Sequence, residues 1–149
     1  MTALPIGGEA IGKAAPLIDD WEWREGMLVS WTLDEDDERC TIRLIRDVSD
    51  CHPGSAGPVW SAVSLAGEHS DYELLPGLSW PDVDDPSGAT AGCLLGLLGD
   101  LRQVRRGGRG WDVAVDCGGN GPLWQSGPNI GRVAVLVALQ RGRWGGANV

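Results

Sequence analysis

The chain has 149 residues, of which 42% are hydrophobic and 22% are charged. This composition is that of a folded domain and excludes wholesale disorder, and the length fits one domain over residues 1–149. A net charge of −9 argues against direct binding to nucleic acid, because phosphate contacts need clustered Lys and Arg.

The first part of the chain predicts strands joined by polar loops. Residues 1–18 are rich in Gly, Ala and Pro and predict an N-terminal arm or a short helix. Strands are predicted over 27–33 and 40–48, and the short acidic loop between them favours a hairpin. Residues 49–58 are dense in turn formers, and a third strand follows over 59–67. One face of this third strand holds alternate residues, namely Val59, Ser61, Val63 and Leu65.

A central helix is predicted near 86–104, after an acidic stretch whose three prolines indicate an irregular connection over 68–86. Asp85 is a good N-cap, and Pro86 suits the first helical position. Arginines at the C-terminal end would offset the helix dipole. The apolar stripe that supports this helix comprises Leu94, Leu97, Leu98, Leu101 and Val104.

Three glycines fall inside this predicted helix. Gly92, Gly96 and Gly99 share one side of it, and each costs about 1 kcal/mol relative to Ala. We expect them to permit a close approach of the helix backbone to a sheet. The alternative is that the chain simply uses Gly often, since it has 23.

The C-terminal third predicts a second hairpin and a segment of ambiguous type. Residues 111–117 alternate as a strand, and a Gly-rich turn joins them to a partner strand at 123–126. Residues 129–143 fit a buried strand or a helix capped by Asn129 equally well by periodicity. The expected fold class is therefore α+β, with two or more antiparallel hairpins and one or two helices.

Part of the helical region resembles a known motif. Leu75-Pro76-Gly77-Leu78, Asp85-Pro86 and Gly92-Cys93-Leu94-Leu95 match the segment L-P-x-L-x-D-P-A-T-x-G-C-L-L-x-L, with extra residues between its halves. The motif is typical of a family of small uncharacterised phage- and prophage-encoded proteins. In that family a Trp-containing strand, a turn and a small-residue helix follow. The resemblance therefore implies a phage origin and favours a helix near 129–141.

No catalytic or metal-binding set is predicted. The four cysteines and two histidines lack a C-x-x-C pair, so we expect reduced, unliganded thiols and no cofactor. His69 near Asp71 is a conceivable acid–base pair, but no nucleophile motif accompanies it. No run reaches about 18 apolar residues and no secretory signal is visible, so we expect a cytoplasmic protein, in the bacterial host if phage-encoded.

Charge is divided unevenly along the chain. Residues 1–50 and 51–100 each carry −7, whereas residues 101–149 carry +5. The acidic part is the expected contact surface for a basic partner protein, with nearby Trp residues as anchors. The acids expected there are Asp34, Glu35, Asp36, Asp37, Glu38, Glu68, Asp71 and Glu73. A second set is expected to contact anions or to remain solvated, namely Arg102, Arg105, Arg106 and Arg109. The alternative is that such arginines neutralise the acids within the fold.

These observations lead to three hypotheses about function. The first is a non-enzymatic phage accessory protein that binds another protein, such as a host defence or regulatory component. The second is a structural virion or assembly component, and the third and weakest is a small hydrolase that uses His69.

Overall fold

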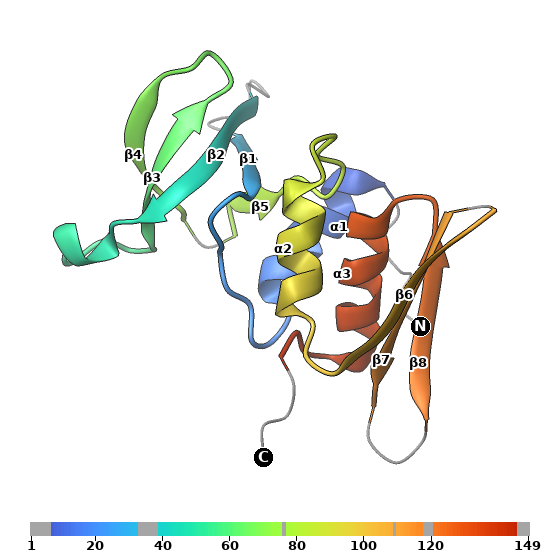
Figure 1. Cartoon of the computed structure of the whole chain (residues 1–149). Helices are drawn as coiled ribbons and strands as arrows, with labels where there is room; N and C mark the ends of the chain where they lie inside the picture. Colours follow the sequence, from blue (N-terminus) through green and yellow to red (C-terminus); the bar gives the residue numbers. More distant parts are fainter. Residues whose placement is uncertain (1–6, 33–38, 76, 109, 118–120, 146–149) are drawn as a thin grey trace.

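The computed structural model describes residues 7–32, 39–75, 77–108, 110–117 and 121–145. Within them, two antiparallel sheets and three α-helices form the α+β fold expected from the sequence (Figure 1). The helices are α1 (Gly8–Ala14), α2 (Ala89–Leu97) and α3 (Ile130–Arg141), with short 3₁₀ turns η1 (Ala15–Leu17) and η2 (Ser49–Cys51). The strands are β1 (Leu28–Thr32), β2 (Arg39–Asp47), β3 (Val59–Ser64), β4 (His69–Glu73), β5 (Ser79–Pro81), β6 (Leu101–Gly107), β7 (Gly110–Asp116) and β8 (Pro122–Gly127).

The larger sheet has the order β4-β3-β2-β1-β5. The predicted hairpin of β1 and β2 is confirmed, with Val29 opposite Ile42. The prediction of an irregular 68–86 segment is wrong, because β4 and β5 form there at the two edges of the sheet. A short edge strand needs few buried side chains, and β4 turns only Tyr72 toward the core, against Trp31.

The alternate set noted for β3 is divided between buried and open positions, since Val59 is 4% exposed and Ser61 and Val63 are half-buried. Trp60 and Ala62 point into the core and are 6% and 0% exposed, whereas Leu65 is 76% exposed. The small side chain of Ala62 and the large ring of Trp60 fit beside Leu44 and Tyr72, which are on the same face of the sheet. Packing between strands, and not the alternation of apolar residues in the sequence, decides which side chains of β3 are buried.

The central helix is shorter than predicted. It begins after Gly88, whose φ of 79° is left-handed, and its C-cap at Leu98 is extended. Residues 101–107 form β6, so the arginines there lie on a strand and not at a helix end. Pairing with β7 places Val104 opposite Val113, and this tertiary contact overrides the helical spacing.

The glycines of α2 do not mediate a close approach. Gly92 and Gly96 are exposed, and Gly99 lies beyond the helix. A Cβ at Gly92 would meet no atom within 4 Å. Helix α2 packs beside α3 instead of against a sheet (Figure 1). Nothing in the structure explains the glycines of α2.

Close backbone approach occurs elsewhere, where α1 meets the end of β5 and α3 meets the segment that follows β5. A Cβ on Gly12 would lie 2.5 Å from the carbonyl oxygen of Pro81, and one on Gly131 would lie 2.3 Å from that of Val83. Both distances are far shorter than a real Cβ contact, so larger residues would push these helices away.

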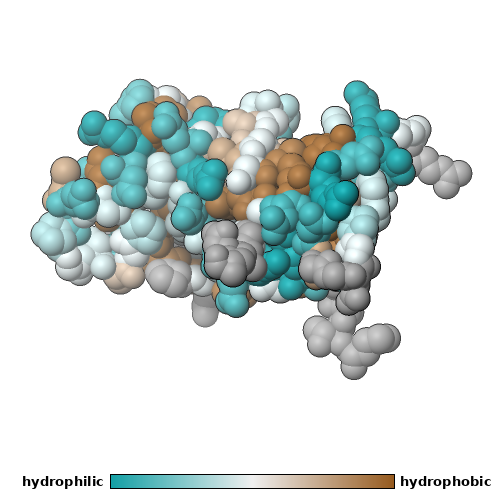
Figure 2. Space-filling model, turned by 60° about the horizontal axis from the view of Figure 1, so that its bottom comes forward, coloured by the Kyte–Doolittle hydropathy of each residue, from teal (hydrophilic) through white to brown (hydrophobic). Residues whose placement is uncertain are grey.

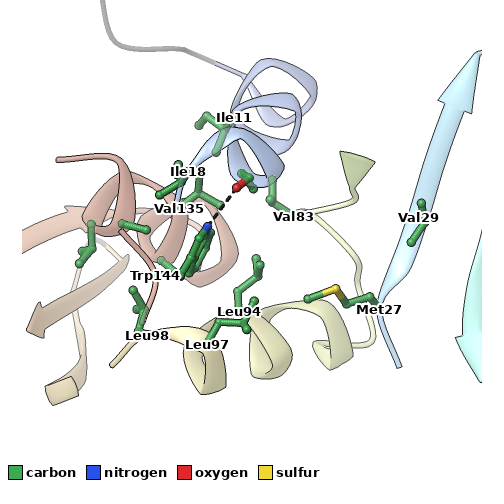
Figure 3. Packing of buried hydrophobic residues seen from close by; sticks show 14 of the residues in the cluster. Ile11, Ile18, Met27, Val29, Val83, Leu94, Leu97, Leu98, Val135 and Trp144 are labelled. Carbon is green, nitrogen blue, oxygen red and sulfur yellow. Dashed lines mark hydrogen bonds between the residues drawn. The ribbon is translucent and has the colours of Figure 1, made fainter. Parts of the chain in front are cut away.

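The core joins both sheets through the helices. Helix α3 lies between α2 and the sheet β6-β7-β8, and Asn129 caps it by accepting from the backbone N–H of Arg132, as predicted for the helical alternative. Residues 8–18 are a packed element and not an arm, since Ile11 and Ile18 are buried. Figure 3 shows Trp144 between α2 and η1, where its indole N–H donates to the carbonyl of Ala15 at 3.0 Å.

No helix of the described residues is both long enough and apolar enough to span a bilayer.

We expect Leu97→Ala to lower the free energy of unfolding by about 2–5 kcal/mol, because the substitution leaves a cavity between α2 and its neighbours. Leu97 is 6% exposed, and the matched control Leu65→Ala changes a leucine that is 76% exposed. Urea denaturation measures both. Equal midpoints for the two variants would mean that α2 is peripheral to the core.

Candidate functional site

The acids expected to contact a partner are only partly brought together. Residues 34–38 lie outside the described residues. Glu68, Asp71 and Glu73 are exposed on or beside the edge strand β4. His52 Nε2 lies 2.9 Å from a carboxylate oxygen of Asp71, and the backbone N–H of Ala56 donates to Glu73 at 3.0 Å. The protein's own 49–58 loop therefore occupies part of this acidic surface.

The conceivable acid–base pair has a different histidine from the one expected. Asp71 contacts His52 and not His69, and both side chains of the pair are more than 40% exposed. The described residues hold no group of three or more His, Cys, Asp and Glu that is arranged to bind a metal ion. The four thiols are free, and burial raises the pKa of Cys93.

The expected arginine set lies along β6 and pairs mainly with β7. Arg102 contacts Asp116 at 2.8 Å, and Arg105 contacts Asp112 at 2.9 Å. Arg105 also covers the ring of Trp124, with 5.0 Å to its centroid. Arg106 lies over Trp111 at 5.7 Å, and position 109 lies outside the described residues. Arg102 and Arg105 thus pair with acids of residues 101–149 and not with the acids of residues 1–100.

A shallow hollow of about 250 Å³ adjoins this sheet at the β6–β7 turn. Its walls are mainly glycine backbone, so they offer few side chains to a ligand. The residues that form it are Gly107, Gly108, Gly110, Trp111, Asp112, Ser126 and Gly127.

The most enclosed charge belongs to Asp85, whose side chain is 1% exposed. The two terminal guanidinium nitrogens of Arg43, Nη1 and Nη2, donate to its carboxylate at 2.9 and 3.2 Å. Ser87 and Thr90 add hydroxyl and backbone N–H donors. Burial alone would raise the pKa of Asp85, but the hydrogen bonds from Arg43, Ser87 and Thr90 hold that pKa well below its ordinary value. All of these donors are structural, so Asp85 anchors the fold and is not a free acid.

The strongest candidate for a binding site is an apolar groove between η1, the 21–23 segment and the chain that follows β4. We call it the Trp21–Leu75 groove. Its hollow measures about 230 Å³. Leu17 is 77% and Leu75 is 39% exposed in its walls. The residues that line it are Pro16, Leu17, Trp21, Trp23, Pro58, Leu74, Leu75, Gly77 and Ser79.

Aromatic contacts hold one wall of this groove in place. Trp21 packs edge-on against Trp23 with ring centroids 5.1 Å apart, and it also contacts Trp144 at 5.6 Å. Trp21 is thereby linked to the core, where Trp144 is fully buried. The indole N–H of Trp21 is buried and has no hydrogen-bond acceptor among the described residues. The indole N–H of Trp60, which does not line the groove, also lacks one.

Acidic residues neighbour Trp21 and Trp23 in the chain. Four exposed acids lie next to these tryptophans or within two residues of them, namely Asp19, Asp20, Glu22 and Glu25. Of these four, only Glu22 forms an ion pair with a described residue, a 3.6 Å contact with Arg24. The sequence reasoning missed this segment, although the alternation of acids and Trp in "DDWEWRE" was a visible signal.

Apolar surface is also open elsewhere. Figure 2 shows brown apolar areas between teal hydrophilic side chains on the side of the molecule that lies at the bottom of Figure 1. The exposed large hydrophobic residues are Leu17, Ile45, Leu65, Leu75, Leu78, Leu101 and Trp124. Of these, Leu17 and Leu75 line the groove. Leu78 lies close to Leu75, because its backbone N–H donates to the Leu75 carbonyl at 3.1 Å.

No protein-family model, curated protein or solved structure matches the chain.

We expect Asp85→Asn to destabilise the protein most at neutral pH. The pKa of Asp85 is lower in the folded protein than the value of about 3.9 in the unfolded chain. The ionised carboxylate therefore stabilises the fold at a pH above about 3.9, and this stabilisation is lost as the pH falls below it. The loss at pH 7 should stay below the roughly 3–5 kcal/mol of a fully buried pair, because the Arg43 side chain is 33% exposed.

The measurement is the free energy of unfolding at pH 7, 5 and 3 for wild type, Asp85→Asn and the control Asp50→Asn, which changes an exposed acid. The difference between wild type and Asp85→Asn should shrink toward pH 3. A difference that stays constant with pH would show that the charge of Asp85 does not stabilise the fold.

Proposed function

We propose that the protein is a non-enzymatic accessory protein that acts by binding a partner protein through the Trp21–Leu75 groove. The observation that carries this proposal is the combination of a preformed apolar hollow with leucines exposed in its walls. Exposed apolar surface that gathers at one place is typical of interaction sites, whereas single exposed leucines are ordinary.

The size of the groove favours side chains of a protein over a small molecule. Small-molecule sites usually measure about 300–1,000 Å³ and bury most of the ligand. The hollow of about 230 Å³ is smaller and has room for one or two large side chains. Tryptophans such as those of its wall are common at the energetic centres of protein interfaces.

Charge supports a partner with a basic surface. Residues 1–100 carry −14 in total, the sum of −7 and −7. Among the described residues, one ion pair joins this acidic part to the basic C-terminal part, namely Asp84 with Arg132 at 2.7 Å. The negative field is therefore largely left to attract a basic partner from solution.

The phage resemblance of residues 74–101 extends the proposal to the biological setting. We infer that the protein is phage-encoded and that its partner is a host defence or regulatory component. An accessory role of this kind needs affinity and specificity for one protein and no catalytic groups.

We expect the double variant Leu17→Ser/Leu75→Ser to lose a partner that the wild type retains in affinity capture from bacterial lysate. The matched control is Leu65→Ser/Ile45→Ser, because Leu65 and Ile45 are 76% and 37% exposed but do not line the groove. All four positions are exposed, so both variants should fold, which thermal unfolding checks.

A partner that both variants retain equally would contradict the groove as the binding site. So would a wild-type protein that retains no specific partner, or one found only as a component of purified phage particles.

A further inference from the structure

We propose that copies of this chain associate head to tail, with the edge strand β6 of one copy pairing with the edge strand β4 of the next. The inference goes beyond the proposed function, because neither strand lines the Trp21–Leu75 groove. It is carried by two open strand edges that bear opposite charges and lie on opposite sides of the helices (Figure 1).

Strand β6 offers a long open edge. It is the outer strand in the order β6-β7-β8, and six of its seven residues are exposed, with Val104 half-buried. Alternate residues of such a strand turn their backbone N–H and C=O groups away from the neighbouring strand. On the side away from β7, these groups have no backbone partner among the described residues. They are therefore available to a further strand.

Two arginines decide which kind of strand this edge accepts. Arg102 and Arg105 contact Asp116 and Asp112, which lie on one face of β7, and the two arginine side chains are 55% and 59% exposed. Each contact uses one nitrogen of a guanidinium group that has five N–H donors, so donors remain for a second carboxylate. Like charges on paired strands are destabilising, so β6 disfavours the β6 of another copy and favours an acidic strand.

Strand β4 is an acidic edge of this kind. It is the outer strand of the larger sheet, and Asp71 and Glu73 are exposed on one of its faces, about 7 Å apart along the strand. One carboxylate oxygen of Asp71 contacts His52, and one of Glu73 accepts the backbone N–H of Ala56. The second oxygen of each carboxylate has no partner among the described residues, so both acids can bind an arginine.

The charged side chains of the two edges match in spacing. Arg102 and Arg105 are three residues apart, so strict alternation would place them on opposite faces of β6. A register shift at the start of β6 brings them onto the same face. A β4 strand laid beside β6 can therefore direct both Asp71 and Glu73 toward these arginines.

The positions of the edges make the pairing intermolecular. Because β4 and β6 lie on opposite sides of the helices, they cannot pair within one copy (Figure 1). Strand β4 belongs to residues 1–100, which carry −14, and β6 belongs to residues 101–149, which carry +5, so the field aligns copies head to tail. Each pairing leaves a free β4 at one end and a free β6 at the other, which gives open chains and not closed dimers. A contact of five paired residues is small, so the association is weak.

Sedimentation velocity in low salt from about 0.01 to 1 mM protein tests this association. We expect the weight-average sedimentation coefficient to rise with concentration and to pass the value of a dimer. Over the same range, ¹⁵N spectra should show amide shifts concentrated in residues 69–73 and 101–107 together.

A pair of charge-reversed variants tests the two edges. Asp71→Lys/Glu73→Lys makes β4 basic, and Arg102→Glu/Arg105→Glu makes β6 acidic, so each variant alone should raise Kd at least about 5-fold. An equimolar mixture should associate like the wild type, because every β4 then meets a β6 of opposite charge. If thermal unfolding shows that the acidic variant is misfolded, Arg102→Gln/Arg105→Gln replaces it alone and should also weaken association.

The matched control is Asp19→Lys/Glu25→Lys. It changes the net charge by the same +4 as the β4 variant, at exposed acids that lie outside both edge strands. This control should keep more of the wild-type association than the β4 variant does.

A sedimentation coefficient that stays constant up to about 1 mM would overturn the inference. So would equal effects of the β4 variant and the control, or a mixture of folded charge-reversed variants that does not associate. A plateau at the dimer with shifts in only one of the two strands would show a symmetric contact and would also overturn it.

Discussion

The joining of the larger sheet to α2 depends on one ion pair, that of Arg43 with the buried carboxylate of Asp85. The carboxylate is removed from water, and it is tolerable there only because six donor groups, two each from Arg43, Ser87 and Thr90, satisfy it. The donors come from two distant parts of the chain, since Arg43 lies on β2 and Thr90 on α2. The hydroxyl of Thr90 in turn accepts the backbone N–H of Leu28, so β1 is tied to the same point. The neighbouring Asp84 binds Arg132 of α3, and Val83, which precedes Asp84, is buried.

The groove inherits its shape from this anchor. Arg43 also donates to the carbonyl of Gly26, and the backbone N–H of Gly26 donates to Leu44, so the end of the 19–25 segment is fixed on β2. The beginning is fixed by the backbone N–H of Trp144, which donates to the carbonyl of Asp19. A segment held at both ends presents Trp21 and Trp23 in one arrangement before any partner arrives. Such preorganisation reduces the entropy lost on binding and therefore favours affinity.

The parts of this structure that could be predicted from sequence are those with strong local signals. The β1–β2 and β7–β8 hairpins follow alternation and turn residues, and α3 follows its Asn129 cap. The end of α2 at Leu97 could not be predicted, because the leucines and Val104 keep a helical spacing past it, although the chain pairs with β7 from Leu101 onward. Strand β4 was missed because an exposed edge strand carries little apolar pattern. The groove joins residues 16–23 to residues 58 and 74–79, a contact between distant segments that no local signal encodes.

The central claim, that a partner binds at the Trp21–Leu75 groove, is tested most directly by amide hydrogen exchange of the protein alone and in complex with its captured partner. The account predicts slower exchange in residues 17–23 and 74–75, with little change in β6 and β7, because the bound segment shields the groove walls. Unchanged exchange at the groove, with protection confined to the arginine-bearing strand β6 and its neighbour β7, would contradict it and place the binding surface on the smaller sheet.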